Sequence, residues 1–316
     1  MQLRRLMIVL AICIVGLVVA AFGMYRSWQN FTSGGLLGIL SSHGHYMMVD
    51  GTSTTVTLDH KAERIVAVGP NVADLVSELA GDSVVATTAA PYQVTNTVKQ
   101  RVAPDVNAIV ALKPDIVIIE DGAESIELVS PLREKGVKVA LLREPATVKD
   151  VEDQTRNVGK LLGRESKADS LIATMMNYIR DTESLRFAHR DDPKQTVAVY
   201  NDNGLYGIPK TLNADMLTYV GVDNAAAKSG VKQFNFGTKA DLIKADPDII
   251  IVPMDIHAPD YNRDAIYANY YNDPVLANLK AIKNKKVAIV STDTLLAKSY
   301  HIGRGIYTIA QVVYAR

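Results

Sequence analysis

The chain has 316 residues, in which 34 lysines and arginines balance 34 aspartates and glutamates. Hydrophobic residues make up 48% and charged residues 22%, the composition of a folded protein rather than a disordered one. A formal net charge of zero argues against a nucleic-acid binder, which normally carries a basic excess. The single cysteine, Cys13, excludes internal disulfides and cysteine-based zinc sites.

An apolar run over 6–23 follows two arginines near the N-terminus. A spanning helix needs about 17–25 apolar residues, whereas the apolar core of a cleaved signal has about 7–15. The run therefore predicts an uncleaved membrane anchor over 1–26, with the rest of the chain outside the cytoplasm because the arginines stay inside. Cleavage after Gly23, which would release a periplasmic protein, is the alternative. Cys13 lies in the middle of the run, where it does not fit a lipidation site.

Residues 27–48 mix glycine, serine and apolar residues without a clear period, and they are predicted to form a tether. His43 and His45 stand on this segment. Two histidines on a tether are not a preorganised metal site, so we interpret them as part of the spacer.

From Val49 onward, short apolar runs alternate with helical patterns, which is typical of an α/β fold with a mainly parallel sheet. Each run is rich in valine and isoleucine and is bounded by turn residues, as expected for strands buried on both faces. The predicted strands are 65–68, 84–87, 115–119, 137–142, 196–200, 248–252 and 286–290.

The sequence of the folded part contains an internal repeat. Segments 108–119 and 241–252 each combine a short helix, a Pro-Asp pair and an apolar strand. Earlier in each half, 69–81 pairs loosely with 211–221, an amphipathic helix closed by glycine. The repeat predicts two related α/β lobes.

We place the N-terminal lobe at 49–147 and the C-terminal lobe at 194–316. Between them, 148–193 shows apolar residues at helical spacing with charges between them. This pattern predicts one long connecting helix, bent near Gly159 or Gly163.

Four segments follow one another along the chain: an opening hairpin, strand and first helix (49–81), a helix–Leu-Lys-Pro-Asp–strand element (107–119), the start of a long helix (158–172) and a late helix and strand (273–290). In this order they resemble the periplasmic binding proteins that capture ferric siderophores, haem and cobalamin for ABC importers. The resemblance implies two Rossmann-like lobes joined by one long α-helix, with a ligand cleft between the lobes. It also implies a binding protein rather than an enzyme, and an ABC permease as partner.

Importer-linked members of that family carry an acidic residue on each lobe that docks onto permease arginines. The matching positions here are Asn107 and Ala240, with Asp105 and Asp241 close by. This departure and the predicted anchor favour an alternative, a membrane-tethered sensor or assembly subunit that uses the fold without an importer.

Ligands of open α/β sheets bind outside the carboxyl ends of the strands, and this rule selects loops in both lobes. Tyrosine rings there can stack on a flat ligand, an arginine can pair with carboxylates, and a histidine or tyrosinate can bind iron. His257 or Tyr206 is the candidate iron ligand. The candidate ligand-binding residues are Tyr92, Arg143, Tyr206, His257, Tyr261, Tyr300 and His301.

The leading hypothesis is an extracytoplasmic solute-binding protein for an iron complex, either siderophore or haem, or for cobalamin. It has no intrinsic cofactor, and the metal chelate is its cargo. An enzyme using Asp121, Asp255 or His257 as acid and base lacks a nucleophile–base pair at recognisable spacing. A free-metal binder needs ligands from both lobes, whereas His257 and His301 both lie in one.

Overall fold

The computed structural model describes residues 46–89, 100–122, 125–231 and 237–314. Residues 46–316 form one compact unit. Within the described ranges, no helix is both long and apolar enough to cross a membrane. The predicted anchor over 6–23 lies outside the described residues, as do His43 and His45.

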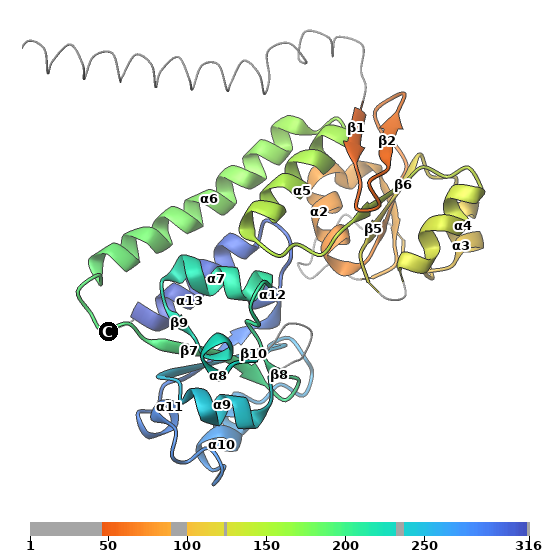
Figure 1. Ribbon diagram of the computed structural model, residues 1–316. Helices are drawn as coiled ribbons and strands as arrows, with labels where there is room; N and C mark the ends of the chain where they lie inside the picture. The colour runs from red at the N-terminus through yellow and green to blue at the C-terminus, as the bar shows by residue number, and fades with distance from the viewer. Residues whose placement is uncertain (1–45, 90–99, 123–124, 232–236, 315–316) are drawn as a thin grey trace, which may run out of the picture. The chain divides into compact units, whose positions relative to one another are not determined.

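The N-terminal lobe holds a hairpin and a four-stranded parallel sheet in the order β4-β3-β5-β6 (Figure 1). Its strands are β1 (Tyr46–Val49), β2 (Thr55–Leu58), β3 (Ile65–Val68), β4 (Val84–Thr87), β5 (Ile116–Glu120) and β6 (Val139–Leu142). Its helices are α2 (Pro70–Ala80), α3 (Val106–Ala111), α4 (Val129–Glu134) and α5 (Val148–Leu161).

The C-terminal lobe repeats this plan. Its strands are β7 (Thr196–Asn201), β8 (Gly204–Leu205), β9 (Asp223–Asn224), β10 (Ile249–Met254) and β11 (Val287–Ser291). The parallel pairs run β9-β7-β10-β11, and β8 adds a short antiparallel pair to β7. In each parallel sheet the first strand along the chain, β3 or β7, is one of the two central strands.

Helices cover both faces of this second sheet. They are α7 (Leu212–Val220), α8 (Ala225–Ser229), α9 (Lys239–Ala245), α10 (Arg263–Tyr271), α11 (Lys280–Lys283), α12 (Thr292–Leu295) and α13 (Ile302–Tyr314). The two lobes are linked by α6 (Glu165–Ala188), the long helix that extends from the first lobe to the second in Figure 1.

The connecting segment differs from the expected single helix over 148–193. Two helices, α5 and α6, meet at a break where Gly163 has a φ of 64°, a left-handed conformation that suits glycine. A side chain at this position would also collide with the ring of Tyr46, 2.6 Å away. The 24 residues of α6 cover about 36 Å at 1.5 Å per residue, so this helix alone makes the crossing.

The folded part also begins earlier than expected. The sequence assigns residues up to 48 to the tether, but β1 starts at Tyr46 and pairs with β2. Met48 is buried and Tyr46 packs against the main core, so hydrophobic burial holds this short strand in place.

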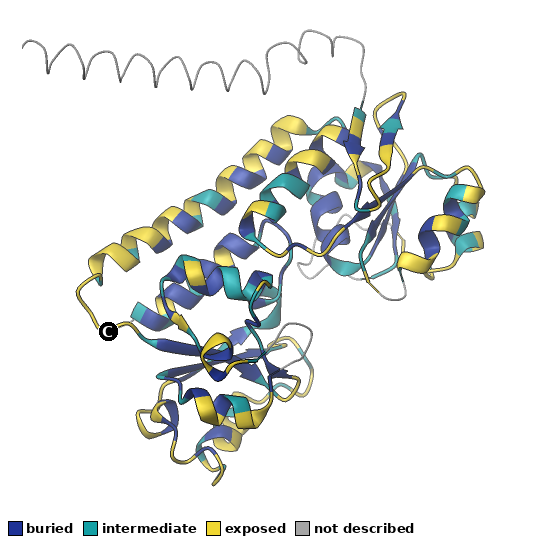
Figure 2. Ribbon diagram, viewed as in Figure 1, coloured by how far each residue is buried: buried dark blue, intermediate teal, exposed yellow. Residues whose placement is uncertain are grey.

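One hydrophobic cluster runs through both lobes. Side chains alternate along each buried strand, so every second residue faces the same side of its sheet. Ile65 and Ile116 in the first sheet and Val197 and Ile251 in the second all belong to this shared cluster. Each sheet covers its opposite face with a separate cluster. Figure 2 shows the strands of both sheets as buried, with exposed positions on the outer helix faces.

The shared cluster continues along the packing of α13 on α6. Gly303 lies so close to α6 that a Cβ would come within 2.5 Å of the carbonyl oxygen of Met175. Met175 itself is fully buried. A residue without a side chain therefore sets how closely these two helices approach.

We expect Gly303→Ala to destabilise the domain by about 1–3 kcal/mol, because the methyl group must push the α6 backbone away. Urea unfolding monitored by circular dichroism measures this change. Ser184→Ala, on the exposed face of α6, is the control and should stay within about 0.5 kcal/mol of the parent. Equal midpoints for Gly303→Ala and the parent would contradict this packing.

Candidate functional site

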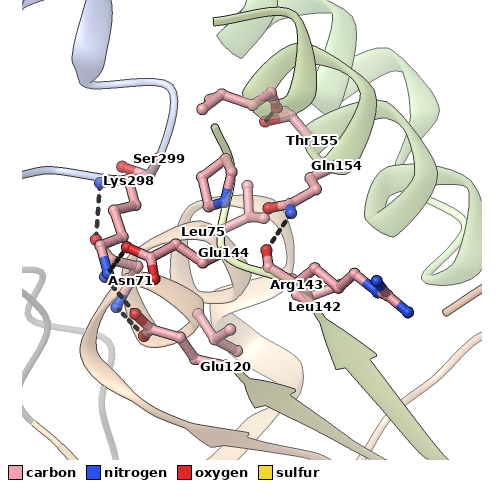
Figure 3. Close-up of a pocket in the computed structure, with 13 residues that line it drawn as sticks. Asn71, Leu75, Glu120, Leu142, Arg143, Glu144, Gln154, Thr155, Lys298 and Ser299 are labelled. Atoms are coloured by element: carbon pink, nitrogen blue, oxygen red, sulfur yellow. Dashed lines mark hydrogen bonds and ion pairs between the residues drawn. The ribbon is translucent and has the colours of Figure 1, made fainter. Parts of the chain in front are cut away.

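A pocket lies where the carboxyl ends of the N-terminal strands meet the C-terminal lobe (Figure 3). Both lobes and α5 contribute to it. Its lining residues are Asn71, Val72, Leu75, Glu120, Leu142, Arg143, Glu144, Pro145, Val151, Gln154, Thr155, Lys298 and Ser299. The pocket therefore occupies the position where open α/β sheets bind ligands.

Asn71 joins the two lobes across this pocket. Its side-chain amide donates to Glu120 at 2.6 Å, and its backbone N–H donates to the other oxygen of the same carboxylate at 3.0 Å. The amide oxygen of Asn71 in turn accepts the backbone N–H of Lys298 at 2.8 Å. Gly69, just before α2, has a φ of 104° and lies against Glu120, where a Cβ would clash. The glycine lets the carboxylate reach the start of α2.

A second link between the lobes involves charged groups. The ammonium of Lys298 lies 2.8 Å from a carboxylate oxygen of Glu144. Glu144 is 65% exposed, so the pair contributes little to stability in water. Its effect is local, because it occupies the only lysine that lines the described pocket.

Arg143 turns away from the pocket centre, as Figure 3 shows. Its Nε donates to the carbonyl oxygen of Gly51 at 2.5 Å, and its own carbonyl oxygen accepts from the side chain of Gln154 at 2.5 Å. In this conformation its guanidinium contacts the β1–β2 turn rather than a ligand in the pocket.

The pocket is small in this conformation. Its free volume is about 20 Å³, enough for about one water molecule. Ligand pockets for molecules of chelate size usually measure about 300–1,000 Å³. A chelate can therefore enter only if the loops of the two lobes separate at the Lys298 contacts or if it binds at the outer rim.

Tyr300 and His301 lie at the lobe interface rather than in open solvent. Tyr300 is 7% exposed and belongs to the shared cluster. Burial, together with the nearby carboxylates of Glu78 and Asp74, raises the pKa of Tyr300. Its ring centroid lies 4.1 Å from that of His301. The hydroxyl is thus held neutral and partly shielded by its neighbour.

The Nε2 atom of His301 is buried and has no hydrogen-bond partner among the described residues. Burial, and next the charge of Arg304, lowers the pKa of His301 to about 4. The imidazole is therefore neutral at pH 7, the form that binds metals. Because Nε2 is covered, it can reach a ligand only after the interface moves.

The other candidates lie at the ends of C-terminal strands. His257 is on the turn after β10, with 72% of its side chain exposed, and its Nε2 is 3.7 Å from Asp293. Tyr206 follows β8, is half-buried and packs against the shared cluster. Tyr261 is half-buried in the loop before α10. Tyr92 lies outside the described residues.

None of these C-terminal candidates lines the described pocket, so their role in binding stays a prediction. Of the seven candidate residues, Arg143 is the one that does line it. The strand-end rule selects the loops that contain Asn71, Glu120 and Lys298, but the choice among residues favoured aromatic rings and missed these three. Asn71 was missed because an amide bears no charge, and its link to Lys298 spans 227 positions.

The two acidic residues near the expected docking positions act as helix caps. Asp105 accepts the backbone N–H of Ala108 at the start of α3. Asp241 forms a capping box with Thr238 at the start of α9, and hydrogen bonds from Thr238 lower the pKa of this carboxyl. Asn107 and Ala240, at the docking positions themselves, are exposed.

We expect Asn71→Ala to lower the free energy of unfolding by about 1–3 kcal/mol, because it removes the amide that joins Glu120 to Lys298. Urea unfolding at pH 7 tests this. Asn177→Ala, which removes an amide contacting Arg180 on the exposed side of α6, is the matched control. Similar small losses in both variants would mean that the interlobe hydrogen bond does not contribute to stability.

A second prediction concerns pH. The unfolded chain protonates His301 near pH 6.5, whereas the folded protein does so only near pH 4. The free energy of unfolding should therefore fall as the pH drops between these values, by about 1.4 kcal/mol per unit. In His301→Gln this part of the slope should disappear, while the exposed variant His60→Gln should keep it. Identical slopes for parent and His301→Gln in urea titrations from pH 7 to pH 5 would refute the assignment.

Comparison with known proteins places this geometry in a family. The periplasmic binding protein family model matches residues 65–294. The chain is 23% identical over 276 residues to the ABC transporter substrate-binding lipoprotein YvrC of Bacillus subtilis (strain 168), with 84% of each chain covered. It is 24% identical over 253 residues to a cobalamin-binding protein of Halobacterium salinarum, covering 77% of this chain and 67% of that one.

Solved structures agree in fold. A periplasmic haem-binding protein, RhuT, from Roseiflexus sp. RS-1 superposes with a TM-score of 0.67 at 21% identity, over 80% of this chain and 98% of that chain. A possible iron-binding periplasmic protein from Staphylococcus epidermidis gives 0.67 at 20% identity, over 81% and 100%. Since the family model matches both sheets and the helix between them, the chain belongs to the periplasmic binding protein family.

Proposed function

We propose that this protein is an extracytoplasmic solute-binding protein that captures an iron complex or a corrinoid and delivers it to an ABC importer. The observation that carries the proposal is a pocket at the strand ends, lined by charged residues of both lobes, in a chain that belongs to the periplasmic binding protein family. Curated relatives include a substrate-binding lipoprotein and a cobalamin-binding protein, and solved relatives include a haem-binding protein. The chelate is cargo, and no catalytic step is part of the proposal.

Binding is proposed to occur in the cleft between the lobes. The Asn71–Lys298 hydrogen bond and the Lys298–Glu144 pair link its two sides. Tyr206, His257 and Tyr261 follow the ends of C-terminal strands, and we propose that a chelate too large for the pocket contacts them. An imidazole or a tyrosinate there can bind iron or a corrin metal.

The location is proposed to be the outer face of the cytoplasmic membrane. The apolar run over 6–23 would anchor the chain there, and its cleavage would release the same domain. Mass spectrometry of the protein from membranes distinguishes the uncleaved anchor from the cleaved form. A mature chain that begins after Gly23 would contradict the anchor.

Ligand binding can be tested with the full chain in neutral detergent. The protein is scanned from 300 to 700 nm and titrated with haemin, a ferric hydroxamate, a ferric catecholate and cyanocobalamin. Saturation at one equivalent of one of these chelates is expected. If no chelate produces a saturable change, the proposed function is refuted.

In the same titration, His257→Ala should weaken binding more than tenfold, equal to about 1.4 kcal/mol. The thermal midpoint should not change, because 72% of the side chain is exposed. His60→Ala, an exposed histidine in the N-terminal lobe, is the control. Unchanged affinity in His257→Ala would remove this residue from the site.

One feature favours a second candidate function, a tethered sensor or assembly subunit. The exposed docking positions hold Asn107 and Ala240 in place of acids, and the nearby Asp105 and Asp241 are used as helix caps. Purification of the full chain from membranes decides between the two. A permease and ATPase that co-purify support the importer, and their absence beside another stable partner supports the sensor.

A further inference from the structure

The charged groups that line the interlobe pocket differ in whether they are free to contact a ligand. Two carboxylates, Glu120 and Glu144, and two cations, Arg143 and Lys298, line it. Arg143 donates to the Gly51 carbonyl and points away from the centre, as Figure 3 shows. The ammonium of Lys298 is held by Glu144. An anionic ligand would therefore find both cations of the described pocket engaged.

The carboxyl ends of the strands in the two lobes carry more acidic than basic residues. We count the charged residues at and after the carboxyl ends of the strands, within the described part of the chain. Four are basic, namely Arg101, Arg143, Lys210 and Lys298. Seven are acidic, namely Glu120, Asp121, Glu144, Asp202, Asp255, Asp260 and Asp293. His257, in the turn after β10, lies beside Asp293. Charges within about 8 Å of a ligand act on it at physiological ionic strength, so an excess of carboxylates at the strand ends changes affinity.

We propose that the cleft selects chelates without net negative charge, such as a corrinoid or a ferric hydroxamate, over anionic chelates such as haem or a ferric catecholate. This inference rests on the proposed function. The physical reason is that an anion must displace Glu144 from Lys298 and then remain near the released carboxylate and the other acidic groups at the strand ends, whereas a neutral or cationic chelate leaves the ion pair intact.

Glu144 is the specificity-determining residue in this arrangement. Glu144→Gln removes one carboxylate and releases the ammonium of Lys298 toward the pocket. Its side chain is mostly exposed, so the substitution should not affect folding. Glu134→Gln, an exposed acid at the end of α4, changes the net charge equally away from the pocket and is the matched control.

The experiment titrates the full chain, in neutral detergent, with four probes. Cyanocobalamin and ferrioxamine B carry no net negative charge, and haemin and ferric enterobactin are anionic. We expect one of the first two to bind at least tenfold more tightly than either anion. We also expect Glu144→Gln to raise the affinity for haemin about tenfold while Glu134→Gln leaves it unchanged.

The outcomes separate the two proposals. Tighter binding of haemin or ferric enterobactin by the parent protein overturns the charge selection but keeps the solute-binding function. An equal response of Glu144→Gln and Glu134→Gln overturns the role of Glu144. If none of the four probes binds, the proposed function and this inference fail together.

Discussion

The close packing of α13 on α6 is the constraint on which the rest of the structure depends. Gly303 brings the last helix against the backbone at Met175, so the helix that leaves the first lobe becomes part of the core of the second. Hydrophobic side chains of both sheets share that core. Because burial rather than a linker joins the lobes, their relative position is set by packing, and large hinge motions would expose apolar surface.

Because the core holds the lobes rigidly, the contacts at the cleft are the part of the interface that can change when a ligand binds. The hydrogen bond from Lys298 to Asn71 and the ion pair of Lys298 with Glu144 add polar links between the lobes at the pocket. The ion pair is largely exposed, so it is weak and can exchange with water or ligand at low cost, whereas Asn71 is buried. A stiff core with an exchangeable rim fits a protein that binds a solute by small movements.

The two carboxylates of the pocket, Glu120 and Glu144, have different roles. Glu120 is held by the start of α2 and serves the architecture. Glu144 is mostly exposed and pairs with Lys298, so it can vary without disturbing the fold. The proposed charge selection therefore depends on Glu144, which the fold does not need, whereas Glu120 is needed for the fold.

The sequence by itself determined the local elements. The strands Ile65–Val68 and Val84–Thr87 have the bounds that their apolar runs predict, and the internal repeat correctly indicated two related sheets, because strand patterns depend on neighbouring residues. Only the tertiary structure decided that the predicted bend falls at Gly163 rather than Gly159, that Tyr300 and the Nε2 atom of His301 are buried, and that Asn71 pairs with Lys298. These features arise between segments far apart in the chain, where no local pattern specifies which side chains meet.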